Sequence, residues 1–217
     1  MENEKEVKTD RVFQYIYESI KSGEYESGQT LTESEIVNKL QVSRTPVREA
    51  LRRLEKYGLV ESKPHRGVKV ISMTKQRIED LYQVREVLEG LGARLIAQKR
   101  DESAVKKLNG ILTEAEKAVE KNDIHSLSTI NSSFHMEIAQ ASENLYLINI
   151  LNTLQSHISL VMVTSLSNKD RPPENLKEHR MIVDAMESWD PELAEAVIKS
   201  HVRKSYHLAL KKMDITK

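Results

Sequence analysis

The spacing of apolar residues near the start of the chain predicts two helices. The first is expected between Thr9, a candidate N-cap, and Gly23, with an apolar face made by Val12, Phe13, Ile16, Tyr17 and Ile20. Thr32 and Glu35 match a capping box, in which each side chain satisfies a backbone N–H of the other residue. A short second helix is therefore predicted there, with an apolar face made by Ile36, Val37 and Leu40.

A third helix is predicted only two residues after the second. Ser43 is its candidate N-cap, Pro46 stands in the first turn, where its missing N–H costs no hydrogen bond, and Gly58 marks the end. Two short helices joined by such a tight turn form a helix-turn-helix pattern.

Two short β-type runs, at 59–61 and 68–71, follow the third helix and predict a hairpin. Its turn contains Arg66 and Gly67, so the hairpin has the form of a basic wing. The segment 41–71 carries eight Lys and Arg against three Glu, a net charge of +5. Such a cluster marks either a solvated face or a nucleic-acid contact, and the helix-turn-helix context favours nucleic acid.

Arginine side chains gather near the start of the predicted third helix. Arg44 and Arg48 lie one helical turn apart beside Thr45, while Leu51 and Leu54 hold the opposite face in the core. A helix that enters a major groove in this way presents guanidinium groups to guanine edges or to phosphates.

The pattern changes after residue 73, because helix-length periodic segments then follow one another with no further strand. We predict a mainly α protein, with an N-terminal winged helix-turn-helix domain at 1–73 and an all-α antiparallel six-helix bundle at 74–217. The six helices are expected at about 75–98, 102–121, 124–142, 145–167, 174–188 and 191–213.

Several strongly polar residues fall on the predicted apolar faces of this bundle, namely Arg85, Asn131, His135, His179 and His201. Asn131 and His135 are four residues apart and therefore lie on one face of a helix, where both side chains can reach the same ligand. Taken singly, each His fits a core residue bonded to a carbonyl, and Arg85 fits a buried ion pair, with Glu89 or another Glu. Five such groups in one bundle are hard to satisfy without water. A polar cavity that holds a metal ion accounts for them together.

The composition narrows the chemistry. The 217 residues include no Cys, which excludes disulfides, thiolate nucleophiles, iron–sulfur clusters and Cys-based zinc sites. Lys and Arg number 33, as do Asp and Glu, so the net charge gives no sign of a nucleic-acid partner. No apolar run approaches the ~20 residues of a membrane helix, and the acidic start is unlike a signal peptide. We expect a cytoplasmic protein with no membrane partner.

The residues 42–54, followed by Gly58, Leu59 and Val60, resemble the recognition-helix signature of GntR-family transcription regulators. The second domain resembles the FCD effector domain of that family's FadR subfamily, and its six helices resemble the VanR-type branch. This second resemblance is carried by residues 80–85 with Leu88 and Glu89, by 131–135, by 141–144, and by Glu178, His179 and His201.

The resemblance implies roles for individual residues. Those expected to contact operator DNA are Ser43, Arg44, Thr45, Pro46, Arg48, Arg66 and Gly67. In the second domain, His135, His179 and His201 match three histidines that hold a divalent metal, and Arg85 matches an arginine that faces the carboxylate of the effector. Most metal-binding members have Asp where this chain has Asn131, which removes one negative charge. Zinc is the expected ion, with nickel or manganese as alternatives, since three imidazoles themselves favour zinc, nickel or copper.

The leading hypothesis is a homodimeric regulator, a repressor rather than an activator, that binds a palindromic operator and responds to a small organic acid at the metal site. A metal-sensing regulator, in which the ion is the signal, and a purely structural metal are alternatives. A metal-dependent hydrolase is a remote one, because three His with an open position also describe catalytic zinc. The sequence pattern shows no carboxylate placed near these His as an obvious general base and no nucleophile motif. A hydrolase would also give the winged domain no role. We therefore expect no enzyme.

Overall fold

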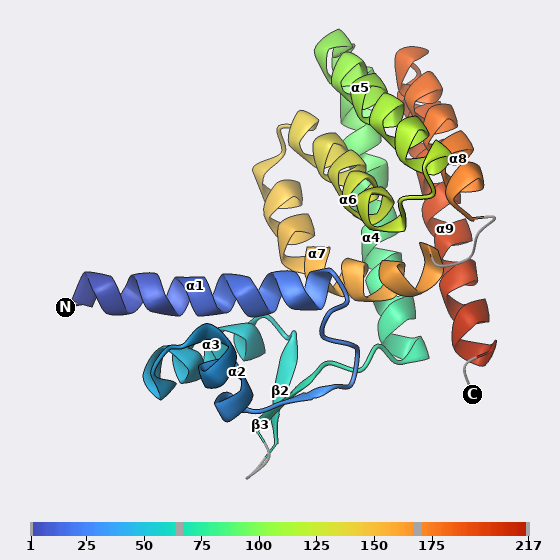
Figure 1. Cartoon of the computed structure of the whole chain (residues 1–217). Helices are drawn as coiled ribbons and strands as arrows, with labels where there is room; N and C mark the ends of the chain where they lie inside the picture. The colour runs from blue at the N-terminus through green and yellow to red at the C-terminus, as the bar shows by residue number, and fades with distance from the viewer. Residues whose placement is uncertain (1, 64–66, 167–170, 216–217) are drawn as a thin grey trace. The chain divides into compact units, whose positions relative to one another are not determined.

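The computed structural model describes residues 2–63, 67–166 and 171–215, and the chain divides into two units, Met1–Met73 and Thr74–Lys217. The elements of the first unit are α1 (Glu2–Lys21), β1 (Thr30–Leu31), α2 (Glu33–Leu40), α3 (Arg44–Lys56), β2 (Val60–Lys63) and β3 (Gly67–Val70). Those of the second are α4 (Lys75–Lys99), α5 (Glu102–Glu120), α6 (Ile124–Ala141), α7 (Leu145–Leu166), α8 (Arg171–Glu187) and α9 (Pro191–Ile215) (Figure 1). The predicted fold class, a winged helix-turn-helix followed by a six-helix bundle, is confirmed.

Helix α1 begins earlier than the sequence pattern indicates. The predicted cap at Thr9 is wrong, because the helix already starts at Glu2 and Thr9 lies inside it. Acidic residues in the first turns favour a helix N-terminus, which explains the longer helix. The buried Thr9 hydroxyl instead donates to a Glu49 carboxylate oxygen at 3.1 Å, so it ties α1 to α3.

The caps of α2 and α3 differ. The capping box predicted for α2 is present: Thr32 Oγ1 accepts from the Glu35 N–H at 3.3 Å, and the Glu35 carboxylate accepts from the Thr32 N–H at 2.8 Å. Ser43 occupies the N-cap of α3 with extended backbone, but its side chain makes no capping hydrogen bond. The Ser43 hydroxyl is thus free to face solvent at the start of α3.

The wing contains a strand that the sequence analysis missed. The antiparallel sheet has the order β1-β3-β2, in which Thr30 pairs with Lys69 and Leu31 with Val68. At the start of β3, Gly67 has φ +86°, and a Cβ there would collide with the Leu31 carbonyl oxygen. A glycine is required at this position both by its backbone conformation and by the close approach of β1.

The core of the first unit joins one face of α1 to the inner face of α3 and the sheet. Its fully buried side chains include Val12, Ile16, Ile20, Ile36, Val47, Ala50, Leu54, Leu59 and Val70. The apolar side of α3 is thereby fixed, and its arginines are left on the outer side.

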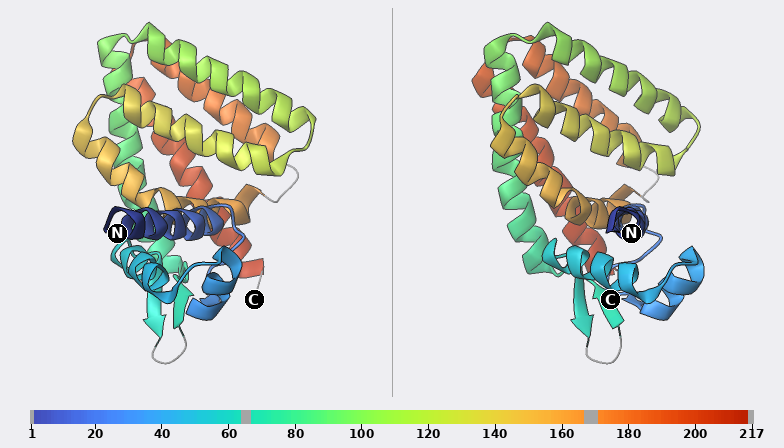
Figure 2. Two further views of the ribbon diagram at one scale, coloured as in Figure 1. Left: turned by 60° about the vertical axis from the view of Figure 1, so that its left-hand side comes forward. Right: turned by 90° about the vertical axis from the view of Figure 1, so that its left-hand side faces the viewer.

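The bundle is built around the long helices α4 and α9, which lie side by side in every view and form the most extensive helix contact (Figures 1 and 2). Helix α5 packs against α6 and α8, and α7 packs against α4, α6 and α9. Helix α8 starts at Arg171, three residues before the prediction, because Pro172 and Pro173 occupy its first turn rather than a break. The main apolar core comprises Ala93, Ile96, Ala97, Ala104, Val105, Leu108, Leu112, Phe134, Ile138, Ile182, Val183, Met186, Ala194 and Ile198.

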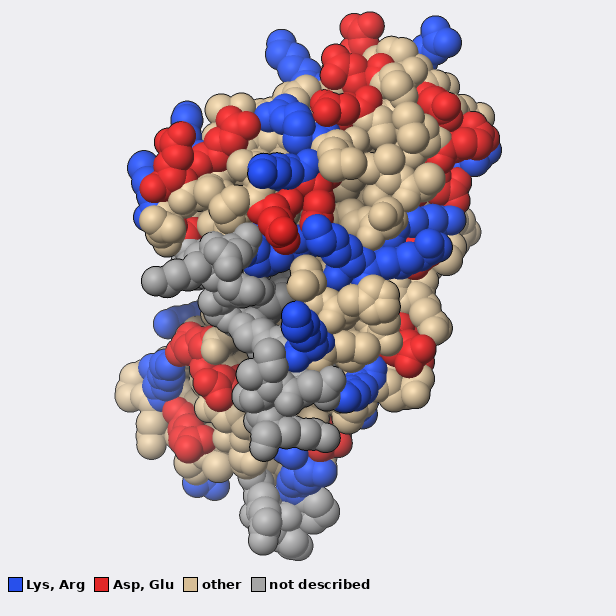
Figure 3. All heavy atoms as spheres, turned by 90° about the vertical axis from the view of Figure 1, so that its right-hand side faces the viewer, with Lys and Arg blue, Asp and Glu red and all other residues tan. Residues whose placement is uncertain are grey.

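The surface of the bundle mixes both signs of charge, as the equal counts of acids and bases suggest. Figure 3 shows basic and acidic side chains interspersed on the side where Figure 1 places α8 and α9. Exposed ion pairs such as Arg203 with Glu86, at 2.6 Å, join neighbouring helices there. No helix within the described residues combines the length and the apolar character needed to cross a membrane.

Candidate DNA-binding and metal sites

The start of α3 presents most of the residues expected to contact DNA. Ser43, Arg44, Thr45 and Arg48 are all exposed. Pro46 departs from this set, because it is buried in the first turn of α3. The expectation that Pro46 contacts DNA is therefore not supported by its position, and its ring serves to start and pack the helix.

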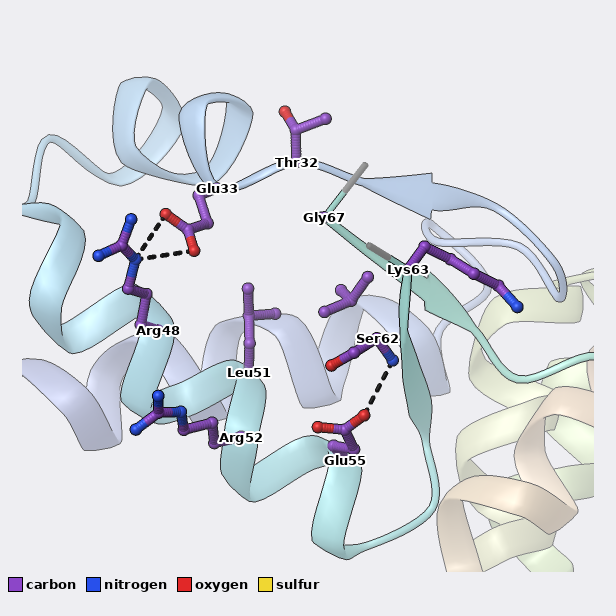
Figure 4. A pocket seen from close by; sticks show the side chains of 10 residues that line it. Thr32, Glu33, Arg48, Leu51, Arg52, Glu55, Ser62, Lys63 and Gly67 are labelled. Carbon is purple, nitrogen blue, oxygen red and sulfur yellow. Dashed lines mark hydrogen bonds and ion pairs between the residues drawn. The ribbon is translucent and has the colours of Figure 1, made fainter. Parts of the chain in front are cut away.

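A groove of about 600 Å³ lies between α3 and the wing (Figure 4). At one end Arg48 Nε lies 2.9 Å from both carboxylate oxygens of Glu33, and this hydrogen bonding raises the pKa of Arg48. At the other end the Ser62 N–H donates to Glu55 at 2.9 Å, which links the wing to α3. Of the two residues predicted at the wing tip, Gly67 lines the groove, and Arg66 lies outside the described residues.

The bundle brings the three predicted histidines together. His135 on α6, His179 on α8 and His201 on α9 are buried, and one ring nitrogen from each lies within 4.8 Å of the others. Their ring centroids are 4.9 to 5.3 Å apart. Phe134 stacks on the His179 ring at 4.1 Å and holds it in place.

Two carboxylates stand behind this cluster, contrary to the expectation that no carboxylate lies near the histidines. Glu89 Oε2 lies 2.8 Å from His135 Nδ1, off the line of a hydrogen bond, so the contact is mainly electrostatic. Glu178 Oε2 lies 2.7 Å from His201 Nδ1 in a hydrogen bond. The signal for Glu178 was present in the sequence, since it precedes His179. Both carboxylates face Nδ1, which leaves Nε2 of each ring to a ligand.

Each carboxylate is held by an arginine. Glu89 forms a buried ion pair with Arg85 one turn earlier on α4, and Glu178 accepts from Arg171 at 2.8 and 3.1 Å. Arg85 thus has the ion-pair partner that the sequence left as an alternative, and it also lies 5.3 Å from the Tyr82 ring. Lys204 also lies 2.7 Å from Glu178 and 3.8 Å from Glu174. With Glu174 included, the carboxylates balance the two arginines and this lysine in charge.

The pKa directions follow from burial and from these pairs. Burial lowers the pKa of His135, of His179 and, to about 4, of His201, against the opposing pull of the neighbouring carboxylates on His135 and His201. Burial would raise the pKa of Glu89, but the Arg85 charge, helped by the neighbouring His135, outweighs it and holds the pKa at about 2. At neutral pH the histidines are therefore neutral, the form in which imidazole binds a metal.

Asn131, the expected fourth ligand, is buried beside the cluster and already has a partner. Its Oδ1 accepts from Asn175 Nδ2 at 2.7 Å, and Asn175 Nδ2 also lies 3.4 Å from His179 Nε2. Asn175 Oδ1 accepts in turn from Arg171 at 3.0 Å. Sequence analysis missed both Arg171 and Asn175. Asn175 precedes His179 by four residues, the same spacing that indicated Asn131 and His135, whereas Arg171 next to two prolines gave no periodic signal.

The space around the histidines is small. One cavity of about 20 Å³ is lined by Asn131, Asn175 and His179 among apolar side chains, and another of about 10 Å³ is lined by Arg85, Glu89 and His135. Each holds about one water molecule. An organic acid would need the helices around it to move apart.

The donor set fits a divalent metal ion. His135 Nε2 is buried without a hydrogen-bond partner among the described residues, which is costly unless something binds it. Tetrahedral Zn–N bonds of about 2.1 Å place nitrogens ~3.4 Å apart, a separation within the 4.8 Å that bounds the distances between the three ring nitrogens. Carboxylates that orient the second nitrogen of a ligating His are typical of metal centres.

Comparison with known proteins decides the family. The family model "Bacterial regulatory proteins, gntR family" matches residues 8–70, and the model "FCD domain" matches residues 80–204. A probable D-xylose utilization operon transcriptional repressor of Paenarthrobacter nicotinovorans is 33% identical over 193 residues, which cover 88% of this chain and 84% of the relative. The chain belongs to the GntR family of bacterial regulators and carries an FCD domain. This confirms the resemblance predicted from the sequence.

A further relative and a solved structure agree with this assignment. The gluconate operon transcriptional repressor of Bacillus subtilis (strain 168) is 31% identical over 79% of this chain and 72% of its own. The structure of E. coli McbR/YncC shares the fold, with a TM-score of 0.84 over 95% of this chain and 98% of its own at 19% identity. The chain is accordingly a DNA-binding transcription regulator and not an enzyme, as its sequence predicted.

Proposed function

We propose that this regulator is a repressor whose DNA binding is controlled by a small organic acid at a three-histidine metal site. Two of the similar proteins are described as repressors of sugar or gluconate operons, which supports the first part. The observation that carries the second part is the convergence of three buried histidines backed by two carboxylates.

In this proposal the exposed residues at the start of α3 contact the operator. Arg44 and Arg48 read bases or grip phosphates, Ser43 and Thr45 bond the backbone, and Gly67 lets the wing approach it. One short recognition helix contacts too few base pairs to specify a single site in a genome. A homodimer on a palindromic operator contacts two half-sites and so doubles the number of base pairs that are read.

The metal ligands in this proposal are His135, His179 and His201, with Asn131 as a weaker oxygen ligand. Zinc suits three imidazoles, and nickel or manganese are the alternatives. Asn131 Oδ1 accepts from Asn175 Nδ2 at 2.7 Å, so a bond from this oxygen to an ion would share the oxygen with that contact or replace it.

The charge balance of the site favours an acid as the effector. Arg85 and Glu89 cancel in charge, Arg171 and Lys204 outweigh Glu178 unless Glu174 is counted with them, and the histidines are neutral. The paired groups therefore offer no net negative charge, and a bound divalent ion adds two uncompensated positive charges. A carboxylate that reaches the ion and the Arg85 guanidinium would neutralise part of this charge in a low-dielectric interior.

The test is the variant His179→Ala, with His207→Ala as its control. His207 lies on α9, is exposed and is outside the cluster. Elemental analysis and a thermal melt with and without chelator should show that the wild type and His207→Ala bind metal and are stabilised by it, and that His179→Ala does neither while still binding DNA. A wild-type protein that carries no metal and melts at the same temperature with added Zn²⁺, Ni²⁺ and Mn²⁺ would refute the proposal.

A metal-sensing regulator is the second candidate, because the cavities beside the histidines hold no more than a water each. In that case the ion alone changes operator affinity. A gel-shift titration with metal, in the presence and absence of candidate carboxylic acids, separates the two candidates: only an acid-responsive regulator changes its affinity when acid is added to the metal-loaded protein.

A further inference from the structure

We propose that Glu33 is a positioning residue for DNA reading, which holds the Arg48 guanidinium in the orientation that recognises guanine. The inference rests on the proposed contact between Arg48 and the operator, and it concerns a carboxylate for which the sequence suggested no role. The two side chains come from different helices of the helix-turn-helix, with Glu33 at the first position of α2 and Arg48 in the second turn of α3.

The ion pair with Glu33 uses the Nε side of the Arg48 guanidinium and leaves its terminal Nη side available. Arg48 Nε lies 2.9 Å from each Glu33 oxygen, and no described residue is recorded as a partner of its terminal Nη groups. Figure 4 draws both interactions of the pair from Nε and none from the terminal nitrogens. Two terminal N–H groups are the ones that bond guanine O6 and N7 end-on, so the pair leaves the base-reading atoms available.

The carboxylate itself is held by a rigid support. Glu33 follows Thr32 directly, and Thr32 is fixed by the reciprocal capping bonds with Glu35 at 2.8 and 3.3 Å. The Glu33 side chain is 32% exposed and that of Arg48 is 58% exposed, so the pair lies at the rim of the groove where a duplex can reach it. An arginine already confined by such an anchor loses less conformational freedom on binding a base than a free one does.

The pair also changes what Arg48 contributes to affinity. Glu33 cancels its charge, so Arg48 in the pair adds little to the sequence-independent attraction of phosphates and acts mainly through the base. Removing Glu33 should therefore weaken recognition of the correct sequence and strengthen attraction to any duplex. Ordinary electrostatic repulsion by a carboxylate predicts something different, namely an equal gain for all duplexes.

The experiment measures affinities of full-length protein for two duplexes of equal length at several salt concentrations. One is the duplex that wild-type protein enriches from a randomised pool, and the other is its scrambled sequence. The discrimination ratio, the affinity for the first over that for the second, should fall about 3- to 10-fold in Glu33→Ala. The salt slope of non-specific binding should steepen by about one unit, because one cation is released from its partner.

Glu33→Gln separates positioning from charge, since it removes the same charge as Glu33→Ala but keeps one acceptor for Arg48 Nε. We expect its ratio to lie between those of the wild type and Glu33→Ala. Equal changes for both duplexes in both variants would overturn the proposal. The control is Glu61→Ala, which removes an acid from the wing, paired with Lys63 at 2.9 Å, without touching Arg48. It should leave the ratio unchanged.

A double-mutant cycle with Arg48→Ala completes the test. If Glu33 acts through Arg48, Glu33→Ala should leave the ratio unchanged in the Arg48→Ala background. A further fall there would overturn the proposal. If Arg48→Ala by itself keeps the wild-type ratio, the proposed base contact fails, whereas an unchanged ratio in Glu33→Ala alone refutes only the positioning role. Thermal melts identify any variant that has lost its fold. If Glu33→Ala is unfolded, Glu33→Gln, which preserves the side-chain volume at the start of α2, still tests the proposal.

Discussion

Breaking the buried ion pair between Arg85 and Glu89 should strongly destabilise the bundle. Their side chains are 2% and 1% exposed, so neither charge can turn to water when its partner is removed. We expect Glu89→Leu and Arg85→Met each to lower the free energy of unfolding, because each leaves one uncompensated charge inside the protein. The double variant replaces the pair with apolar side chains and should be more stable than either single variant.

The magnitude follows from two independent considerations. The environment lowers the pKa of Glu89 from 4.5 to about 2, which corresponds to about 3 kcal/mol in favour of the ionised form, and this is fully present at neutral pH, above both values. Removal of one partner from a buried pair typically costs 3–5 kcal/mol. For a unit of this size about 4 kcal/mol lowers the melting temperature by roughly 10–15 °C.

The assay is urea unfolding followed by tryptophan fluorescence in the presence of chelator. The chain has one Trp, and Trp189 packs against the bundle core, so the signal reports on the bundle without the winged unit. The exposed pair of Arg203 with Glu86 gives the control, since Arg203→Met should change stability by less than ~1 kcal/mol. Single variants of Arg85 or Glu89 within 1 kcal/mol of the wild type, or a double variant that costs the sum of the singles, would refute the reasoning.

Three further outcomes are expected. Glu178→Gln should weaken metal affinity about 10- to 100-fold in a competition with a chromophoric chelator, whereas Glu187→Gln, on the exposed side of α8, should not; equal affinities would show that Glu178 does not orient His201. Gly67→Ala should lower both the melting temperature of the winged unit and its DNA affinity, since its backbone is left-handed and β1 approaches closely; unchanged values would contradict this. Leu108→Ala, in the fully buried bundle core, should cost about 2–5 kcal/mol by urea unfolding, and a cost below 1 kcal/mol would mean that α5 is loosely packed.

The sequence alone determined the helices of both units, the capping box of α2 and the hairpin of the wing. These features depend on local properties, namely apolar periodicity, side chains that cap the nearest N–H groups, and glycine at turns. It also indicated that the three histidines face inward, because the direction of a side chain on an amphipathic helix follows from its position in the repeat. The errors at this level were equally local. The strand β1 has only two residues, which are too few to show a periodic pattern. The first turns of α1 are polar and acidic and carry no apolar periodicity, so the helix was predicted to begin too late.

Only the tertiary structure decided which groups satisfy one another inside the bundle. Glu89 and His135 are 46 residues apart, yet their side chains lie 2.8 Å apart because α4 packs against α6. In the same way Asn175 reaches Asn131 from α8, and Arg48 reaches Glu33 across the turn between α2 and α3. Burial requires every charge to find a partner, but periodicity shows only that a residue points inward and not what it meets there. Which side chains contact each other depends on the crossing angles and the register of the helices, and these are set by the packing of the whole core.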